Sequence, residues 1–337
     1  MLLTGIQWSN ITGRRPFVTS VSGVSLTVLN MMRDLGEQAV RSVDPDVEVV
    51  AVPAADEFAD AMADGLSGEV LLASWLGHPI FEHLDELGVE WMHVPATGVD
   101  AWPRELLAGR TVTCARGASA IPIAEFVMGE ILAFEKQFPD VWLSAPPERW
   151  NVASLGELSG KTLGLIGLGG IGTAVARRAL GFDMRVRALR RRPAREALAG
   201  VELARDLPDV LASADHLVVA APATPATNGM LDARAFDLVK PGVHIVNIAR
   251  GALIDQDALR VALDDGRVAM ASLDTVDPEP LPEGHWMYEH PKVRLSAHVS
   301  WSTPRGFERM VALFTENLER YLAGQPLHDV VDADEGY

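Results

Sequence analysis

The chain has 337 residues, of which 48% are hydrophobic, and it carries a formal net charge of −17. The length suits two domains, and the charge argues against binding to nucleic acid or to anionic membranes. The sequence contains no apolar run of roughly 18 residues that could span a membrane, and its N-terminus lacks the features of a signal peptide. A single cysteine, Cys114, excludes an intrachain disulfide and is compatible with a reducing cytoplasm, where we expect the protein to reside.

Short apolar runs separated by turn residues fill the chain up to residue 118. We predict a helix over Leu26–Val43 and strands over Val47–Val52, Val70–Ala73 and Val89–Val94. The first 45 residues, including Gly13-Arg14-Arg15-Pro16, do not match a clean first strand followed by a glycine turn. The sequence therefore does not predict which strand or helix begins this region.

After residue 120 the pattern changes to strands that alternate with helices. A long helix is predicted over Ile121–Phe138, and the proline-rich segment 139–147 ends it. Strands follow over Thr162–Ile166, Arg185–Leu189, His216–Ala221, His244–Ile248, Val268–Leu273 and Val293–Leu295, with helices over Ile171–Leu180, Leu207–Ala212, Ala233–Leu238 and Asp255–Asp265. Such alternation indicates a parallel sheet covered on both faces. Because the last helix, Pro304–Gly324, is predicted to pack back on the first region, we expect a domain of residues 119–301 inserted into a discontinuous domain of residues 1–118 and 302–337.

Residues 167–172 read Gly-Leu-Gly-Gly-Ile-Gly and lie between a predicted strand and a predicted helix. In that context G-x-G-x-x-G is a dinucleotide-binding fingerprint. Gly167 permits the tight turn, Gly169 lets the backbone approach a pyrophosphate, and Gly172 allows close packing of helix on strand. Amides at the start of the helix, from Gly170 and Ile171, then face the phosphates. The structural alternative is a glycine-rich turn in an α/β core.

The end of the second strand of this unit carries Arg190, Arg191 and Arg192, where NAD-binding proteins usually carry Asp or Glu. No carboxylate lies between residues 184 and 195. An acidic chain has thus gathered cations where a 2′-phosphate would bind, which predicts NADP(H) as the cofactor. A solvated basic face at a strand end is the alternative.

Three polar residues follow strands in the second half of the chain: Arg250 in Asn-Ile-Ala-Arg-Gly, Glu279 between two prolines, and His298 in Ser-Ala-His-Val-Ser-Trp. Ligands of open α/β sheets bind beyond the carboxyl ends of the strands, where these residues fall. Taken singly, the arginine could form a surface ion pair, the glutamate could be solvated, and the histidine could be structural.

Together these motifs resemble the D-isomer-specific 2-hydroxyacid dehydrogenases, from about Val89 to the end of the chain. The glycine loop, the segment from Ala221 to Thr227, the Arg250 motif, the D-x-x-x-x-E-P segment and the late histidine carry the resemblance. The combination looks like the glyoxylate/hydroxypyruvate reductase branch. The resemblance implies a Rossmann-type doubly wound parallel sheet inserted into a smaller, discontinuous, flavodoxin-like α/β substrate domain, and a homodimer formed mainly through the cofactor domain.

The resemblance also implies roles for individual residues, and no metal. Arg250 would anchor a 2-keto acid, His298 would be the proton donor, and Glu279 would be its partner. At the cofactor, we expect Pro222, Thr227 and Asp274. At the substrate, we expect the amides of Thr97 and Gly98 and the side chains of Leu76 and Trp301, with Trp75 as a further candidate. Ala297 departs from the family pattern, because a proline usually precedes the histidine.

Several alternatives stay open. A larger or unusual 2-keto acid could be the substrate, and a cofactor-sensing corepressor-like protein could keep the same residues without turnover. Phosphoglycerate oxidation is disfavoured because the chain ends soon after its tail helix, and formate oxidation is disfavoured because that branch has glutamine at the position of Glu279.

Overall fold

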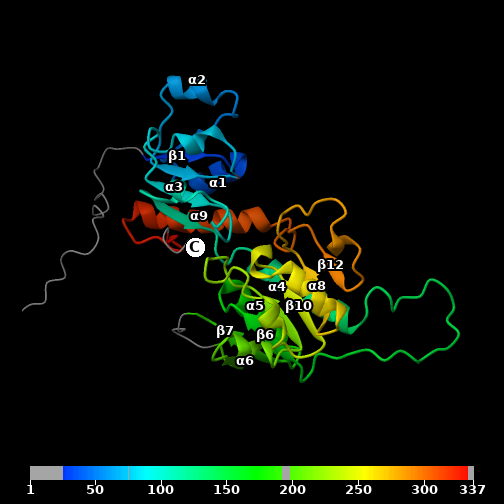
Figure 1. Cartoon of the computed structure of the whole chain (residues 1–337). Helices are drawn as coiled ribbons and strands as arrows, with labels where there is room; N and C mark the ends of the chain where they lie inside the picture. Colours follow the sequence, from blue (N-terminus) through cyan, green and yellow to red (C-terminus); the bar gives the residue numbers. More distant parts are fainter. Residues whose placement is uncertain (1–25, 75, 192–197, 333–337) are drawn as a thin grey trace, which may run out of the picture.

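The computed structural model describes residues 26–74, 76–191 and 198–332, which form two parallel β-sheets with helices around them (Figure 1). The predictions made for Trp75, for Arg192 and for the first 25 residues lie outside the described residues. Among the described residues, no helix has the length and apolar character needed to cross a membrane.

The first sheet has five strands in the order β2-β1-β3-β4-β5, all parallel. This is the flavodoxin-like order, as expected. The strands are β1 (Thr27–Asn30), β2 (Glu48–Ala51), β3 (Val70–Leu72), β4 (Trp91–Val94) and β5 (Thr111–Cys114), and the helices between them are α1 (Arg33–Val43), α2 (Phe58–Ala63), η1 (Pro79–Glu82) and α3 (Arg104–Leu107).

One element of this region differs from the sequence prediction. The single helix predicted over 26–43 is wrong, because the structure has strand β1, a short break and helix α1 there. The buried side chain of Asn30 makes the break: its Oδ1 accepts from the Met32 amide at 2.8 Å, and its Nδ2 donates to the Arg33 carbonyl at 2.7 Å. Arg33, the first residue of α1, has φ +51°, far from the φ of about −63° found inside an α-helix, so the helix cannot continue back through it. Apolar residues on both sides of Asn30 continue the apparent helical pattern, so periodicity did not detect the break.

The second sheet has seven parallel strands in the order β12-β11-β10-β9-β6-β7-β8. Counted from β6, this is the doubly wound Rossmann order with one strand added, which confirms the predicted fold class. The strands are β6 (Thr162–Ile166), β7 (Arg185–Leu189), β8 (Val201–Leu203), β9 (His216–Val219), β10 (Val243–Asn247), β11 (Val268–Leu273) and β12 (Val293–Leu295), and the helices are α5 (Gly170–Leu180), α6 (Leu207–Leu211), α7 (Ala233–Phe236), η2 (Gly251–Leu253), α8 (Gln256–Asp264) and η3 (Trp286–Tyr288).

Two long helices connect the sheets. Helix α4 (Ala120–Glu135) packs on α5 and belongs to the core of the seven-stranded sheet. Helix α9 (Gly306–Leu322) returns to the first sheet, where Phe314 stacks on Trp91 with ring centroids 5.3 Å apart and Leu318 joins the same core. The predicted return of the last helix is therefore confirmed. The domain limits at 118/119 and 301/302 stay a prediction.

A cluster of buried ionisable side chains lies on the face of the seven-stranded sheet that α4 covers. Glu135 pairs with Lys161 and lies 3.0 Å from Nε2 of His216. Nδ1 of His216 is 3.2 Å from Nδ1 of His244, whose Nε2 is 3.0 Å from the Ser272 hydroxyl. Burial, reinforced by neighbouring cationic groups, holds the pKa of His244 well below its usual value. His244 is therefore neutral in the folded chain near neutral pH.

Candidate active site

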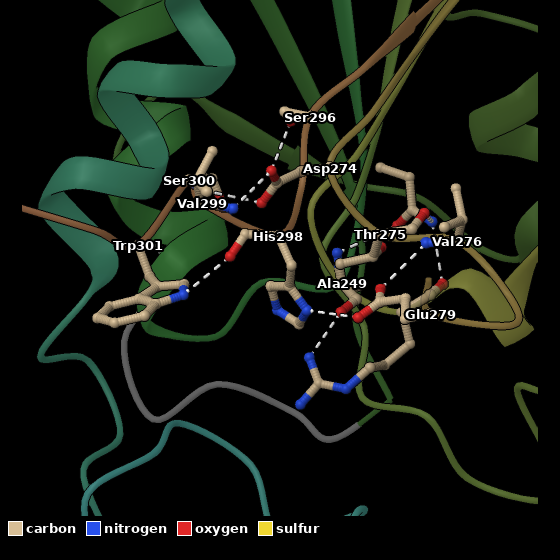
Figure 2. Close-up of polar contacts among 12 residues, drawn as sticks. Ala249, Asp274, Thr275, Val276, Glu279, Ser296, His298, Val299, Ser300 and Trp301 are labelled. Atoms are coloured by element: carbon tan, nitrogen blue, oxygen red, sulfur yellow. Dashed lines mark hydrogen bonds and ion pairs between the residues drawn. The ribbon is translucent and has the colours of Figure 1, made fainter. Parts of the chain in front are cut away.

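The three predicted reactive side chains come together at the carboxyl edge of the seven-stranded sheet. Arg250 follows β10, Glu279 lies beyond β11, and His298 follows β12, and these three strands are neighbours. Nδ1 of His298 is 2.9 Å from Oε2 of Glu279 (Figure 2). The two side chains are 37% and 38% exposed, so the pair is open to a ligand from solvent. A histidine hydrogen-bonded through Nδ1 to a carboxylate has Nε2 left to exchange a proton with a ligand.

Main-chain contacts hold the loops of Arg250 and Glu279 against each other. The Val276 amide donates to Oε1 of Glu279 at 3.1 Å, which orients the carboxylate toward His298. A Cβ on Gly251 would lie 1.9 Å from the carbonyl carbon of Val276, so only glycine permits this approach. The buried Asn247 closes the turn, because its Nδ2 donates to the Arg250 carbonyl at 2.9 Å. Sequence reasoning quoted this asparagine within the arginine motif but gave it no role.

The backbone of His298 is held in the left-handed region, with φ +53°. Histidine is among the non-glycine residues that adopt this conformation more often, but it still needs support from its surroundings. Asp274 supplies that support. Its carboxylate accepts from the Ser296 hydroxyl at 2.5 Å and from the amides of Val299 and Ser300 at 2.9 and 3.0 Å (Figure 2).

Asp274 was predicted to lie at the nicotinamide. Asp274 is 1% exposed. Its carboxylate accepts hydrogen bonds from residues that precede and follow His298 in the loop, and its main-chain carbonyl accepts from the His298 amide at 2.9 Å. The role at the cofactor stays a prediction, and holding the histidine loop is a role that sequence reasoning missed. Trp301 also belongs to this loop, because its indole Nε1 donates to the His298 carbonyl at 3.0 Å (Figure 2).

The glycine loop has the geometry that a dinucleotide requires. Gly167 has φ +105°, and a Cβ on it would lie 2.6 Å from the Ala220 carbonyl oxygen. A Cβ on Gly172 would lie 2.2 Å from the Gly167 oxygen, so helix α5 starts in contact with the turn. Gly169, in contrast, faces open space within 4 Å. An open N-terminus of an eleven-residue helix, behind a turn that no side chain obstructs, fits a pyrophosphate.

Arg190 and Arg191 lie beside this loop. Both are exposed and follow β7 directly, and the Gly167 amide donates to the carbonyl of Leu189, the last residue of that strand, at 3.0 Å. Arg187, one of the other strand arginines, instead pairs with Asp209 at 2.9 Å. Arg190 and Arg191 are therefore the members of the predicted cluster that the described structure brings to the glycine loop.

The predicted cofactor residues Pro222 and Thr227 form the turn that follows β9. The Thr227 hydroxyl donates to the Pro222 carbonyl at 2.7 Å, and it accepts from the Thr224 amide at 2.9 Å. Because Ala220, just before this turn, touches Gly167, the turn lies next to the glycine loop.

On the side of the first sheet, the loop after β4 reaches Arg250. Asp100 of this loop binds the guanidinium at two points, and a Cβ on Gly98 would lie 3.3 Å from Nη2 of Arg250. The predicted amide donors, Thr97 and Gly98, are therefore brought to the arginine, together with Asp100, which sequence reasoning did not select. Leu76 lines a separate open concavity of about 820 Å³, to which none of Arg250, Glu279 and His298 contributes.

The chain is similar in sequence and in fold to known proteins. Residues 128–300, half of the chain, match the model of the D-isomer specific 2-hydroxyacid dehydrogenase NAD binding domain. D-3-phosphoglycerate dehydrogenase of Mycobacterium tuberculosis is 35% identical over 310 residues, which are 90% of this chain and 56% of that protein, so the chain spans little more than half of that relative. Glyoxylate reductase of Thermofilum pendens is 32% identical over 232 residues, 66% of this chain and 68% of that enzyme.

Among solved structures, a D-isomer specific 2-hydroxyacid dehydrogenase from Xanthobacter autotrophicus, in complex with NADPH and MES, superposes with a TM-score of 0.78 at 26% identity. The superposition covers 93% of this chain and 99% of that one. Sequence, fold and comparison thus agree, and the chain belongs to the D-isomer-specific 2-hydroxyacid dehydrogenase family.

Proposed function

We propose that the protein is an NADP(H)-dependent oxidoreductase that reduces a small 2-keto acid, of the glyoxylate or hydroxypyruvate kind, to the D-2-hydroxy acid. The observation that carries the proposal is the pairing of His298 with Glu279 at the end of the sheet, beside the loop of Arg250. A guanidinium next to a histidine–carboxylate pair provides both an anchor for an acid and a donor for a proton.

In this mechanism each side chain has a distinct task. Arg250 binds the substrate carboxylate and the neighbouring carbonyl oxygen, on which negative charge develops. Amides of Thr97 and Gly98 bind the second carboxylate oxygen. NADPH, when bound, supplies the hydride. His298 donates a proton from Nε2 to the carbonyl oxygen, and Glu279 keeps Nδ1 protonated and the ring oriented; in the oxidative direction His298 accepts the proton.

The proton donor is tested by His298→Asn. A positioned general acid contributes roughly 10²- to 10⁴-fold, so we expect kcat to fall within that range while cofactor binding is retained. The control is His328→Asn, since His328 is half exposed and forms a long 3.7 Å ion pair near the end of the chain. A His298→Asn enzyme with wild-type kcat, under conditions where chemistry limits turnover, would contradict the assignment.

The preference for NADP(H) is supported by the exposed Arg190 and Arg191 beside the glycine loop, and by the NADPH in the complex of the Xanthobacter relative. Two partly screened charged hydrogen bonds correspond to roughly 30- to 1,000-fold in kcat/KM for NADPH over NADH. We expect Arg190→Asp to lose most of this preference, and rising salt to reduce it. Arg185→Asp is the matched control, because it makes the same charge change at the start of the same strand. A wild-type preference for NADH would refute the proposal.

The substrate is tested with a panel of 2-keto acids. The panel contains glyoxylate, hydroxypyruvate, pyruvate, phenylpyruvate and branched keto acids. It also contains 3-phosphohydroxypyruvate, because D-3-phosphoglycerate dehydrogenase of Mycobacterium tuberculosis is similar over 90% of the chain. Highest kcat/KM for glyoxylate or hydroxypyruvate supports the proposal, whereas a larger or phosphorylated acid would reassign the substrate. Negligible turnover with every member would favour a cofactor-sensing protein instead.

We also propose that the protein forms a homodimer through the cofactor domain. The segment between α4 and β6, drawn in green, extends far from the rest of the chain over most of its length (Figure 1). It carries Trp142, Leu143 and Trp150, which are 68%, 58% and 73% exposed. An exposed apolar segment of this kind favours contact with another protein surface, and a second copy is the simplest occupant. Sedimentation velocity of wild type and of a Trp142→Ser/Trp150→Ser variant tests this, since a monomeric wild type at micromolar concentration would contradict it.

A further inference from the structure

The guanidinium of Arg250 forms a two-point ion pair that joins the two sheets. Its Nε lies 2.7 Å from Oδ2 of Asp100, and its Nη2 lies 2.8 Å from Oδ1. Asp100 belongs to the loop after β4 of the first sheet, whereas Arg250 follows β10 of the other. The two side chains are 27% and 33% exposed, so a ligand can still reach them.

The remaining donors of Arg250 can be counted. A guanidinium has five N–H groups in one plane. The pair with Asp100 uses the Nε–H and one Nη2–H, and Nη1 donates one hydrogen to the Ala249 carbonyl at 2.7 Å. With respect to the described contacts, one N–H on each Nη atom is left. In a planar guanidinium, one hydrogen on each Nη atom lies at the end of the group, parallel to the other, and this pair forms a fork that matches a carboxylate oxygen next to a carbonyl oxygen.

The contacts of Arg250 also fix the plane of this fork. Asp100 holds one edge of the guanidinium and Ala249 holds another, so the group cannot rotate without breaking a charged hydrogen bond. Gly98 closes the arrangement, because a Cβ there would lie 2.9 Å from Oδ1 of Asp100 and 3.3 Å from Nη2 of Arg250. The loop whose amides we expect at the substrate is thereby packed against the ion pair of Asp100 and Arg250.

We infer that Asp100 is a positioning residue that binds the side edge of Arg250 and directs its end edge, the two-donor fork, at the 2-keto acid. The inference rests on the proposed function and adds to it a determinant for planar carboxylate–carbonyl substrates. Asp100 lies in the same loop as Gly98, so its ion pair with Arg250 also holds the amides of that loop next to the guanidinium. The two parts of the acid-binding site, the amides after β4 and the arginine after β10, therefore form together.

The test is Asp100→Asn, which keeps the shape of the side chain but offers one oxygen instead of two. We expect kcat/KM for the best keto acid to fall roughly 10- to 100-fold, the equivalent of one charged hydrogen bond. Binding of oxalate, a planar dicarboxylate, to the complex of enzyme and oxidised cofactor should weaken by a similar factor in calorimetry. The matched control is Asp265→Asn, which removes a carboxylate from an exposed two-point pair with Arg267.

A double-mutant cycle separates positioning from a general structural effect. In an Arg250→Gln background, Asp100→Asn should cause no further loss, because the fork that it orients is gone. Losses that multiply across the cycle would overturn the inference. So would a tighter oxalate complex or a lower KM for Asp100→Asn, since Asp100 would then be a competitor of the substrate. If the wild-type enzyme neither reduces a keto acid nor binds oxalate, the proposed function itself fails; an active wild type with an unimpaired Asp100→Asn variant refutes the positioning role alone.

Discussion

The carboxylate of Asp274 offers a sharp test of how the histidine loop is held. Asp274→Asn replaces one carboxylate oxygen by an NH₂ group while the side chain keeps its size. Because the two oxygens accept from the amides of Val299 and Ser300 respectively, either orientation of the asparagine places an NH₂ group against a backbone N–H. At least one hydrogen bond to a charged group is lost, and the others lose their charge.

The lost hydrogen bond sets the expected loss of stability in Asp274→Asn. One hydrogen bond to a charged group corresponds to about 2 kcal/mol, which lowers Tm by roughly 4–8 °C for a domain of this size. The loop also holds His298 at φ +53°, and a catalytic group displaced by about 1 Å loses on the order of 10²-fold in rate. We therefore expect a lower Tm together with a kcat reduced about 10²-fold, whereas the dissociation constant of the nicotinamide cofactor changes little.

Calorimetry, steady-state kinetics and cofactor titration measure these three quantities on one preparation. The matched control is Asp215→Asn, since Asp215 accepts from the Thr162 amide at 2.9 Å and pairs with Lys240 at 2.6 Å, away from the histidine loop. It should lose stability without losing kcat. An Asp274→Asn enzyme with a lower Tm but normal kcat would refute the link between this loop and His298. Loss of cofactor binding as the main effect would instead support the role of Asp274 at the nicotinamide.

Three further predictions concern packing and ionisation. Gly251→Ala should abolish activity and lower Tm, because its Cβ would meet the Val276 carbonyl carbon at 1.9 Å; an active, stable variant in the same assays would disprove this packing. Burial raises the pKa of Cys114 to about 11, so the native thiol should react with iodoacetamide at pH 8 far more slowly than the denatured thiol, and equal rates would contradict this. Burial lowers the pKa of His93 to about 4 and that of His244 well below 6.5. As the pH falls, the unfolded chain therefore protonates these histidines before the folded chain does. The free energy of unfolding should then fall below about pH 6.5, by on the order of 1 kcal/mol per pH unit for each histidine. Urea unfolding at several pH values checks the last prediction, and His244→Gln should show a shallower fall than wild type.

Local sequence patterns predicted those features of the fold and the site that depend on one short segment of the chain. The glycine loop and the positions of Arg250, Glu279 and His298 at strand ends follow from short motifs in a strand–helix context. The break at Asn30 did not follow, because it depends on a buried side chain that bonds its own neighbours and on Gly36, where a Cβ would lie 2.0 Å from Oδ1 of Asn30. Periodicity detects apolar faces, but it does not detect a polar residue that closes a turn.

The contact of Asp100 with Arg250 was beyond sequence reasoning for a different reason. The two residues are 150 positions apart and belong to different sheets, so no local spacing joins them. Asp100 lies in a segment that was selected for its amides, and its side chain was therefore overlooked. The part of Asp274 in the histidine loop was missed in the same way, since a role at the cofactor had already been assigned to it.

The return of helix α9 to the first sheet has a consequence for how the protein is made. Strands β1 to β5 leave the ribosome first, but Trp91 stacks on Phe314, and the Val331 amide bonds to the Val112 carbonyl at 2.8 Å. The first sheet therefore lacks this packing partner until the last helix is synthesised. The seven-stranded sheet, in contrast, has all its strands by residue 295. All strands of the first sheet are therefore made before the second sheet begins, but the helix that packs against Trp91 is made after the second sheet ends, and a chain released before α9 exposes the apolar face around Trp91 to aggregation.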